Sequence, residues 1–121
     1  MKIKLKTKIK NNEKTVEEEI NAIYQEEKNK INYLEENSTR VEFDITKMLL
    51  KRENKELKME YDFSKRKAKI YIKDLDRYMD ILLDVKNLKQ EEAKIEIEYI
   101  IEEQTFIYSI EWRNIWVLLE Q

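Results

Sequence analysis

Apolar and charged residues alternate along most of the chain. The alternation covers residues 3–9, 41–45, 57–63, 68–72, 95–101 and 106–112. Successive side chains of a β-strand point to opposite faces of a sheet, so each of these segments has one apolar face and one solvated face. The pattern predicts antiparallel sheet with one wet side.

Residues that favour turns separate the alternating segments. They are Asn11-Asn12, Lys28-Asn29, Asn37-Ser38, Glu53-Asn54, Ser64-Lys65 and Asn87. Asn and Asp tolerate a positive φ better than most residues, so they can replace glycine in tight turns. The turns recur about every 8–12 residues, which is typical of β-sandwiches and β-barrels.

Two stretches also fit a helix. Residues 16–34 and 75–82 carry apolar residues at helical spacing, and the first contains three consecutive glutamates, which are good helix formers. Both stretches fit alternation as well, and Asn29 would compete for backbone hydrogen bonds in the middle of a helix. We favour strands in both.

Composition excludes several classes of protein. The length of 121 residues predicts a single domain that spans residues 1–121. The sequence contains no His, Cys, Gly or Pro. Zinc fingers, thiol nucleophiles, serine triads and glycine-rich phosphate loops are therefore excluded. The net charge of −2 does not predict a nucleic-acid partner. No apolar run approaches the roughly 20 residues of a membrane helix, and residues 1–6 do not resemble a signal peptide. We expect a cytoplasmic protein with no membrane or nucleic-acid partner.

Three segments resemble the YwiB-like family of uncharacterised small bacterial proteins. Residues 29–36 (NKINYLEE) are similar to the strand of that family with a Tyr-x-Glu motif. Residues 48–52 (MLLKR) resemble its apolar strand ending in Arg, and residues 95–99 (IEIEY) its late strand. The resemblance implies an all-β fold, a single antiparallel calycin-like (lipocalin-like) β-barrel of about eight to ten strands, with both ambiguous stretches as strands. It implies no activity.

Two charged residues share faces with apolar residues. Glu35 has the parity of Ile31 and Tyr33, and Arg52 has the parity of Met48 and Leu50. One interpretation is that both are solvated at the ends of their strands. An unpaired buried charge costs several kcal/mol, so if both residues are buried they need a partner. The alternatives are therefore a structural ion pair, or a site that binds an anionic or polar head group.

Five tyrosines fall on the apolar faces. Each brings a large apolar area and a hydroxyl that needs a partner when buried. Two interpretations are open: the tyrosines line an apolar pocket that contains a few hydroxyl groups, or they only pack in the core. The candidate ligand-binding residues are Glu35, Arg52, Tyr33, Tyr61, Tyr99 and Tyr108, with Tyr24 as the fifth tyrosine of the set.

Other charged groups have a simpler interpretation. The alternating lysines of residues 2–10 could follow phosphates, but the acidic residues Glu17 and Glu19, or Glu96 and Glu98, offer opposite charges on neighbouring strands. Asp74, Asp76, Asp80 and Asp84 are interpreted as a solvated face rather than a metal or acid–base site. We expect no metal and no cofactor.

The C-terminal residues 115–119 (IWVLL) are apolar on both faces. Such a segment either plugs the barrel or packs on another subunit, with Trp116 and Leu118 as the candidate dimer contacts.

The main functional hypothesis is a non-catalytic barrel that binds a small, partly apolar ligand in its interior. The alternative is a structural or protein-interaction module with a filled barrel, acting as a homodimer. An enzyme would need Glu, Asp, Lys or Tyr for proton transfer, and no pair of these residues has convincing spacing.

Overall fold

The computed structural model describes residues 1–114, which contain eleven strands and no helix. The predicted all-β, antiparallel fold class is therefore confirmed, with eleven strands where eight to ten were expected. The chain divides into two compact units, residues 24–83 and the residues on either side of them. The expectation of one domain stays a prediction. No helix among the described residues is long and apolar enough to cross a membrane.

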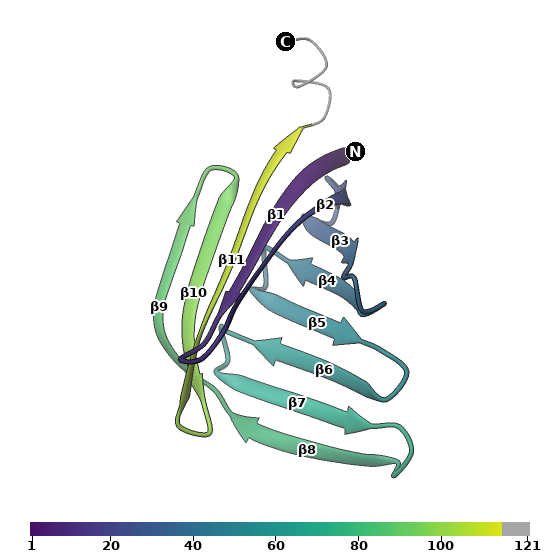
Figure 1. Ribbon diagram of the computed structural model, residues 1–121, viewed down its shortest axis with the longest axis vertical. Coiled ribbons are helices and arrows are strands. Elements are labelled where there is room, and N and C mark those ends of the chain that lie inside the picture. Colours follow the sequence, from purple (N-terminus) through teal and green to yellow (C-terminus); the bar gives the residue numbers. More distant parts are fainter. Residues whose placement is uncertain (115–121) are drawn as a thin grey trace. The chain divides into compact units, whose positions relative to one another are not determined.

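Unit 1 contains residues 1–23 and the chain from residue 84 onward. Its strands pair antiparallel in the order β2-β1-β11-β10-β9 (Figure 1). The last two residues of β2 fall in the other unit. The strands are β1 Lys2–Lys10, β2 Thr15–Gln25, β9 Asp84–Glu91, β10 Lys94–Ile101 and β11 Gln104–Asn114.

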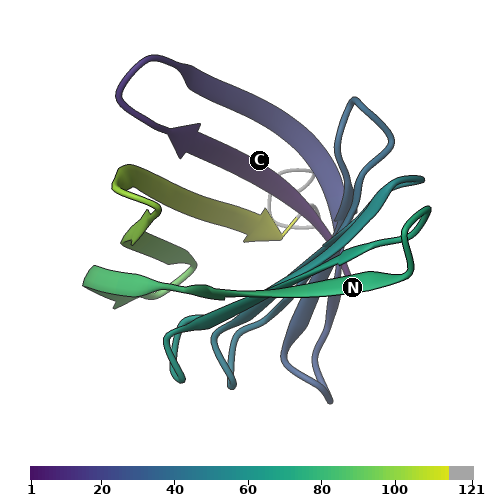
Figure 2. The ribbon, with the colours of Figure 1, turned by 90° about the horizontal axis from the view of Figure 1, so that it is seen from below.

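Unit 2 contains residues 24–83 and is an antiparallel meander in which each strand pairs with the next. Its hairpin turns lie at both ends of the strands (Figure 2). The strands are β3 Lys30–Leu34, β4 Arg40–Asp44, β5 Leu49–Glu53, β6 Leu57–Asp62, β7 Lys67–Ile72 and β8 Arg77–Leu82.

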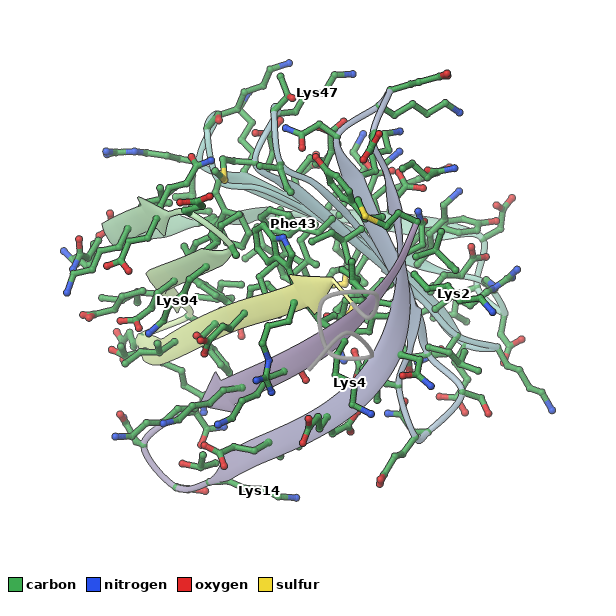
Figure 3. All side chains as sticks on the ribbon, turned by 90° about the horizontal axis from the view of Figure 1, so that it is seen from above. Lys2, Lys4, Lys14, Phe43, Lys47 and Lys94 are labelled. Carbon is green, nitrogen blue, oxygen red and sulfur yellow. The ribbon has the colours of Figure 1, made fainter. Side chains whose placement is uncertain are left out.

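The period of two selects the core of each unit. In unit 1 the alternate residues of β1, β10 and β11 are buried, among them Ile3, Ile97 and Ile110. In unit 2 the buried set includes Phe43 and Leu50, which face each other across β4 and β5. Figure 3 shows Phe43 among other side chains, whereas Lys47 in the β4–β5 turn points away from the ribbon. Alternation thus predicted the core correctly.

Both ambiguous stretches are strands, as expected. Residues 16–34 form most of β2 and all of β3, separated by a turn in which Asn29 has a φ of 53°. The Tyr24 hydroxyl donates a hydrogen bond of 2.6 Å to the Asn29 side-chain oxygen. A left-handed residue cannot continue a helix, so this position interrupts the helical pattern.

The turns differ in part from the prediction. Asn29 and Ser38 lie in turns as expected, and their φ angles are positive. However, the prediction that Asn and Asp replace glycine holds at only two of the eight positive-φ positions among the described residues, Asn29 and Asp76. The others are Ser38, Met48, Arg66, Ala93, Glu102 and Glu103. Hairpin connections that need a positive φ impose it on these residues despite the steric cost.

The turn predicted at Asn87 is wrong. Asn87 lies inside β9, opposite Glu98, and the next register pair joins Tyr99 to Val85. Lys86 is therefore an extra residue in β9, which makes the irregularity a β-bulge. A polar residue at a bulge resembles a turn signal, since both interrupt regular alternation.

Candidate functional site

Three neighbouring strands of unit 2 bring Glu35 and Arg52 to one face. Glu35 directly follows β3 and keeps the parity of Tyr33. In the sheet register, Tyr33 lies opposite Val41 on β4, and Val41 lies opposite Arg52 on β5. Residues that are opposite in register share a face of the sheet. Both charged side chains therefore start from the face that carries the buried residues of β3 and β4.

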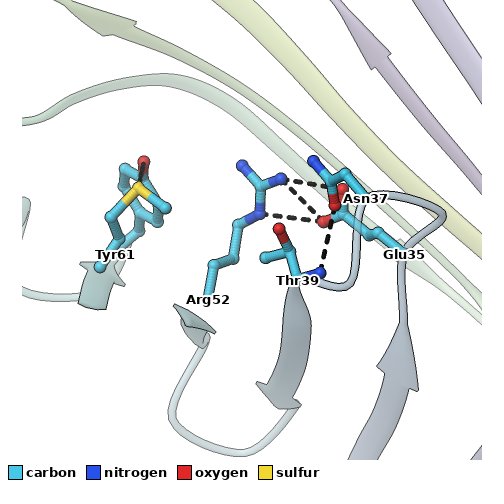
Figure 4. Close-up of polar contacts among 6 residues, drawn as sticks. Glu35, Asn37, Thr39, Arg52 and Tyr61 are labelled. Atoms are coloured by element: carbon cyan, nitrogen blue, oxygen red, sulfur yellow. Dashed lines mark hydrogen bonds and ion pairs between the residues drawn. The ribbon is translucent and has the colours of Figure 1, made fainter. Parts of the chain in front are cut away.

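The two side chains form a bidentate ion pair (Figure 4). Arg52 Nε donates to Glu35 Oε1 at 3.0 Å, and Arg52 Nη2 donates to Oε1 at 2.8 Å and to Oε2 at 2.9 Å. The Arg52 side chain is 22% exposed and the Glu35 side chain 13%. This fork-to-fork geometry is the strong form of the Arg–carboxylate interaction. The pair uses Nε and Nη2, which leaves Nη1 outside it.

A tight turn positions Glu35. The backbone N–H of Glu35 donates to the Thr39 carbonyl at 2.9 Å, and the N–H of Ser38 donates to the Glu35 carbonyl at 3.0 Å. The Asn37 side-chain oxygen accepts the backbone N–H of Thr39 at 3.2 Å, as Figure 4 shows. These hydrogen bonds hold Glu35 at the end of its strand. Asn37-Ser38 had been interpreted only as a turn, so its support of Glu35 was missed.

The electrostatics of the pair favour its charged form. Burial by itself lowers the pKa of Arg52, but the charge and hydrogen bonds of Glu35 outweigh it, so the pKa is raised. Burial also raises the pKa of Tyr61, partly opposed by the Arg52 guanidinium. Near neutral pH, Arg52 is therefore charged and Tyr61 is neutral.

Two of the candidate tyrosines belong to this site. Tyr33 and Tyr61 both act electrostatically on Arg52 and raise its pKa, so both lie near the guanidinium. Tyr61 lies opposite Leu50, and its hydroxyl donates to Met59 Sδ at 3.4 Å. Met59 in turn lies opposite Arg52. The structure therefore brings together Glu35, Arg52, Tyr33 and Tyr61, and it adds Met59, which the sequence had identified only as an apolar-face residue.

The face becomes more open from Arg52 towards β8. Met59 lies opposite Ile70, and Ile70 lies opposite Met79, which is 46% exposed. Met59 and Ile70 are half-buried. This row places adaptable apolar side chains beside the ion pair, because methionine has no branched carbon and fits irregular surfaces.

Tyr99 and Tyr108 belong to unit 1. Tyr108 lies on β11 opposite Ile97, and Tyr99 lies on β10 opposite Phe106, with their ring centroids 5.5 Å apart. Both tyrosines are buried, as their parity predicted. Their assignment to a ligand site stays a prediction.

A cleft lies on the opposite face of unit 2 and was not predicted. It has a volume of about 560 Å³ and is lined by residues of β5 to β8 and the β6–β7 turn. The polar lining includes Lys67 and Asp80, and the apolar lining includes Leu82, which is 87% exposed. The sequence feature that points to this exposed apolar surface is the pair Leu82-Leu83, because neighbouring residues of a strand face opposite sides and only one of the two can be buried.

The lysines of β1 pair largely as expected. Lys6 lies opposite Glu19 and Lys8 opposite Glu17, and the second pair forms an ion pair of 3.6 Å. Lys2, Lys4, Lys14 and Lys94 are labelled in Figure 3. The suggestion that Glu96 and Glu98 neighbour these lysines is wrong, because β10 pairs with β11 and β9 rather than with β1.

The aspartates are largely exposed, as interpreted. Asp76 accepts a hydrogen bond of 2.6 Å from the Tyr71 hydroxyl, and Asp84 forms an ion pair of 3.0 Å with Lys86. Within residues 1–114, no group of three acidic side chains is arranged to hold a metal ion. The C-terminal segment with Trp116 and Leu118 lies outside the described residues.

The described residues form an all-β fold in which neighbouring strands run antiparallel. No known protein family matches the sequence, and no curated protein is detectably similar to it. The structure is similar to the crystal structure of the YwiB protein from Bacillus subtilis, with a TM-score of 0.54 and 16% sequence identity over 93% of this chain and 91% of that one. The chain therefore has a YwiB-like β-barrel fold, as the sequence resemblance implied.

Proposed function

We propose that the protein is a non-catalytic binding protein for a small, partly apolar ligand with an anionic head group. The Glu35–Arg52 pair carries the proposal: a half-buried guanidinium, fixed by a carboxylate, stands beside a row of half-buried apolar residues. The proposed location is the cytoplasm.

The head group would contact Arg52 Nη1, which lies outside the ion pair, and would lie beside Tyr61, which also forms a hydrogen bond with the guanidinium. Glu35 holds the guanidinium in one orientation, which reduces the entropy lost when a ligand binds. Tyr33 and Tyr61, which lie near the guanidinium, would border the head group. The apolar part would lie along Met59, Ile70 and Met79.

The same groups argue against acid–base catalysis. A general acid or base works best when its pKa lies near the operating pH. The pKa values of Arg52 and Tyr61 are both shifted upward, away from neutrality. The two groups therefore suit binding and orientation rather than proton transfer.

Native mass spectrometry tests the proposal in two steps. The purified protein is first inspected for a retained ligand, and it is then titrated with decanoate and with decanol, which differ only in the head group. We expect decanoate to bind more tightly. Arg52→Met should weaken decanoate binding by about tenfold or more, because it removes a charge-assisted hydrogen bond of roughly 1.5–3 kcal/mol.

Lys51→Met is the matched control, because Lys51 precedes Arg52 on β5 and points to the opposite face. It should leave decanoate affinity unchanged. Equal affinities for decanoate and decanol, or equal losses in the Lys51 and Arg52 variants, would overturn the proposal. Thermal unfolding of each variant confirms that it is folded before binding is compared.

A further inference from the structure

Within residues 1–114, two strands have only one neighbouring strand each. Strand β8 pairs with β7, and strand β9 pairs with β10, and these pairings end the strand order of the described residues. The unpaired side of an edge strand presents N–H and C=O groups that can pair with another chain. Figure 1 shows β8 as the last strand of unit 2.

These edges cannot cover each other as a hairpin within one chain. Leu83 alone separates the end of β8 from the start of β9, whereas even the tightest hairpin needs a loop of two residues. The β9 strand of the same chain is therefore not the antiparallel neighbour of β8 along this edge.

Strand β8 carries two charged residues, Arg77 and Asp80, but no lysine, proline or bulge along its edge. Both of its faces carry exposed apolar residues: Tyr78 is 66% exposed and Leu82 is 87% exposed, and Met79 on the other face is 46% exposed. Natural edge strands are normally blunted by lysines, prolines or bulges. Strand β9 has such features, with Lys86 and Lys89 and a bulge in its ladder to β10.

We propose that β8 of one copy pairs antiparallel with β9 of a second copy of this chain. The sheet faces determine the choice of register. Asp80 lies opposite the exposed Lys69, and Lys89 lies opposite Glu96, so Asp80 and Lys89 both point to the solvated face. Ile81 and Leu88 lie opposite the buried residues Ala68 and Ile97, so they share the other face.

One register satisfies both faces. When Asp80 lies opposite Lys89 of the second copy, Ile81 falls opposite Leu88, and Arg77 reaches Glu92 in the turn that follows β9. A shift of two residues places Asp80 opposite Glu91 or Asn87 instead, and a shift of one reverses the faces. This alignment therefore combines one pair of opposite charges, Asp80 with Lys89, and one apolar pair, Ile81 with Leu88. The proposed contact is reciprocal: β8 of each copy pairs with β9 of the other, which gives a closed dimer.

Charge reversal with rescue tests this interface. The oligomeric state of the full chain is measured by sedimentation equilibrium over a range of concentrations. We expect wild-type protein to dimerise at roughly 10–100 µM, as suits an interface at the small end of the range. Asp80→Lys or Lys89→Asp should weaken the dimer about tenfold or more, since each change replaces attraction by repulsion at two symmetric places.

The double variant Asp80→Lys/Lys89→Asp should recover most of the wild-type affinity. It does not restore the pairs of these residues with Lys69 and Glu96 inside one chain, so recovery points to contact between copies. Lys2→Asp, on β1, is the control for net charge and should leave the dimer unchanged. Circular dichroism confirms that each variant is folded.

Hydrogen exchange provides a second readout. Amides of β8 and β9 should exchange more slowly as the protein concentration rises, and those of the β1–β2 turn should not. Wild-type protein that stays monomeric throughout, a double variant no better than the single ones, or a dimer insensitive to Lys89→Asp would each overturn the proposal. Open-ended polymers in place of dimers would overturn the closed arrangement.

Discussion

Two ion pairs of this protein join opposite charges and differ in almost every other respect. Glu35 and Arg52 form a bidentate pair in unit 2, with exposed fractions of 13% and 22%. Lys8 and Glu17 approach to 3.6 Å on neighbouring strands of unit 1, with exposed fractions of 45% and 53%. Water competes with the second pair far more than with the first. The strength of an ion pair on a sheet therefore depends on whether the face that carries it is shielded from water.

The largest expected effect comes from breaking the buried pair. Arg52→Met should lower the free energy of unfolding by about 2 kcal/mol, because it leaves the Glu35 carboxylate half-buried without its partner. Fully buried pairs lose about 3–5 kcal/mol, and the partial exposure of this pair reduces the figure. Urea unfolding at neutral pH measures the change.

The double variant Glu35→Leu/Arg52→Met is the control for that experiment. Replacing both partners by apolar residues removes the uncompensated charge, so most of the lost stability should return. If the double variant is no more stable than Arg52→Met, the two residues do not act as a pair in solution.

An intermediate effect is expected at Glu53. Lys73 Nζ lies 2.9 Å from Glu53 Oε2 and also donates to the Asn54 carbonyl at 2.7 Å. The hydrogen bond from Lys73 lowers the pKa of Glu53 below its ordinary value. Lys73→Met should lower stability by at most about 1 kcal/mol at neutral pH, because solvent screens this partly exposed pair.

The loss should depend on pH with a definite sign. A carboxylate with a lowered pKa contributes stability above its ordinary pKa, and this contribution disappears as the pH falls through the lowered value. The difference between wild type and Lys73→Met should therefore shrink under acid conditions, as measured by thermal unfolding from pH 7 to about pH 3. Lys55→Met, in the β5–β6 turn, should show no such trend.

The smallest effect is expected at the exposed pair. Lys8→Met should change the free energy of unfolding by less than about 0.5 kcal/mol, and added salt should reduce even that difference. Urea unfolding of Lys8→Met beside Lys10→Met, which lacks a glutamate opposite it in β2, measures the contribution. A loss as large as that of Arg52→Met would contradict the contrast between the two pairs.

Much of the fold was predictable, and part of the site was. Alternation identified the buried faces of Phe43, Leu50 and Ile97, and the parity of Glu35 and Arg52 placed both on apolar faces. It could not choose among solvated ends, an ion pair and a ligand site. That choice depends on register, which sets Val41 opposite both Tyr33 and Arg52 and so brings the two charges within reach of each other.

Turns and edges were harder to predict. Asn29 gave a usable signal, but Met48, Arg66 and Ala93 adopt a positive φ that nothing in their side chains favours. The hairpins on either side impose that conformation. The bulge at Lys86 resembled a turn because it breaks alternation without ending the strand.

The sequence by itself determined the strands and which side of each strand is apolar, because a strand's period of two is a local property of the backbone. The tertiary structure decided which strands became neighbours. It therefore decided that Arg52 meets Glu35, that β11 separates Glu96 from the lysines of β1, and that within residues 1–114 β8 and β9 each pair on one side only. Pairing joins residues distant in the chain, and several registers satisfy the same alternation until the whole sheet selects one.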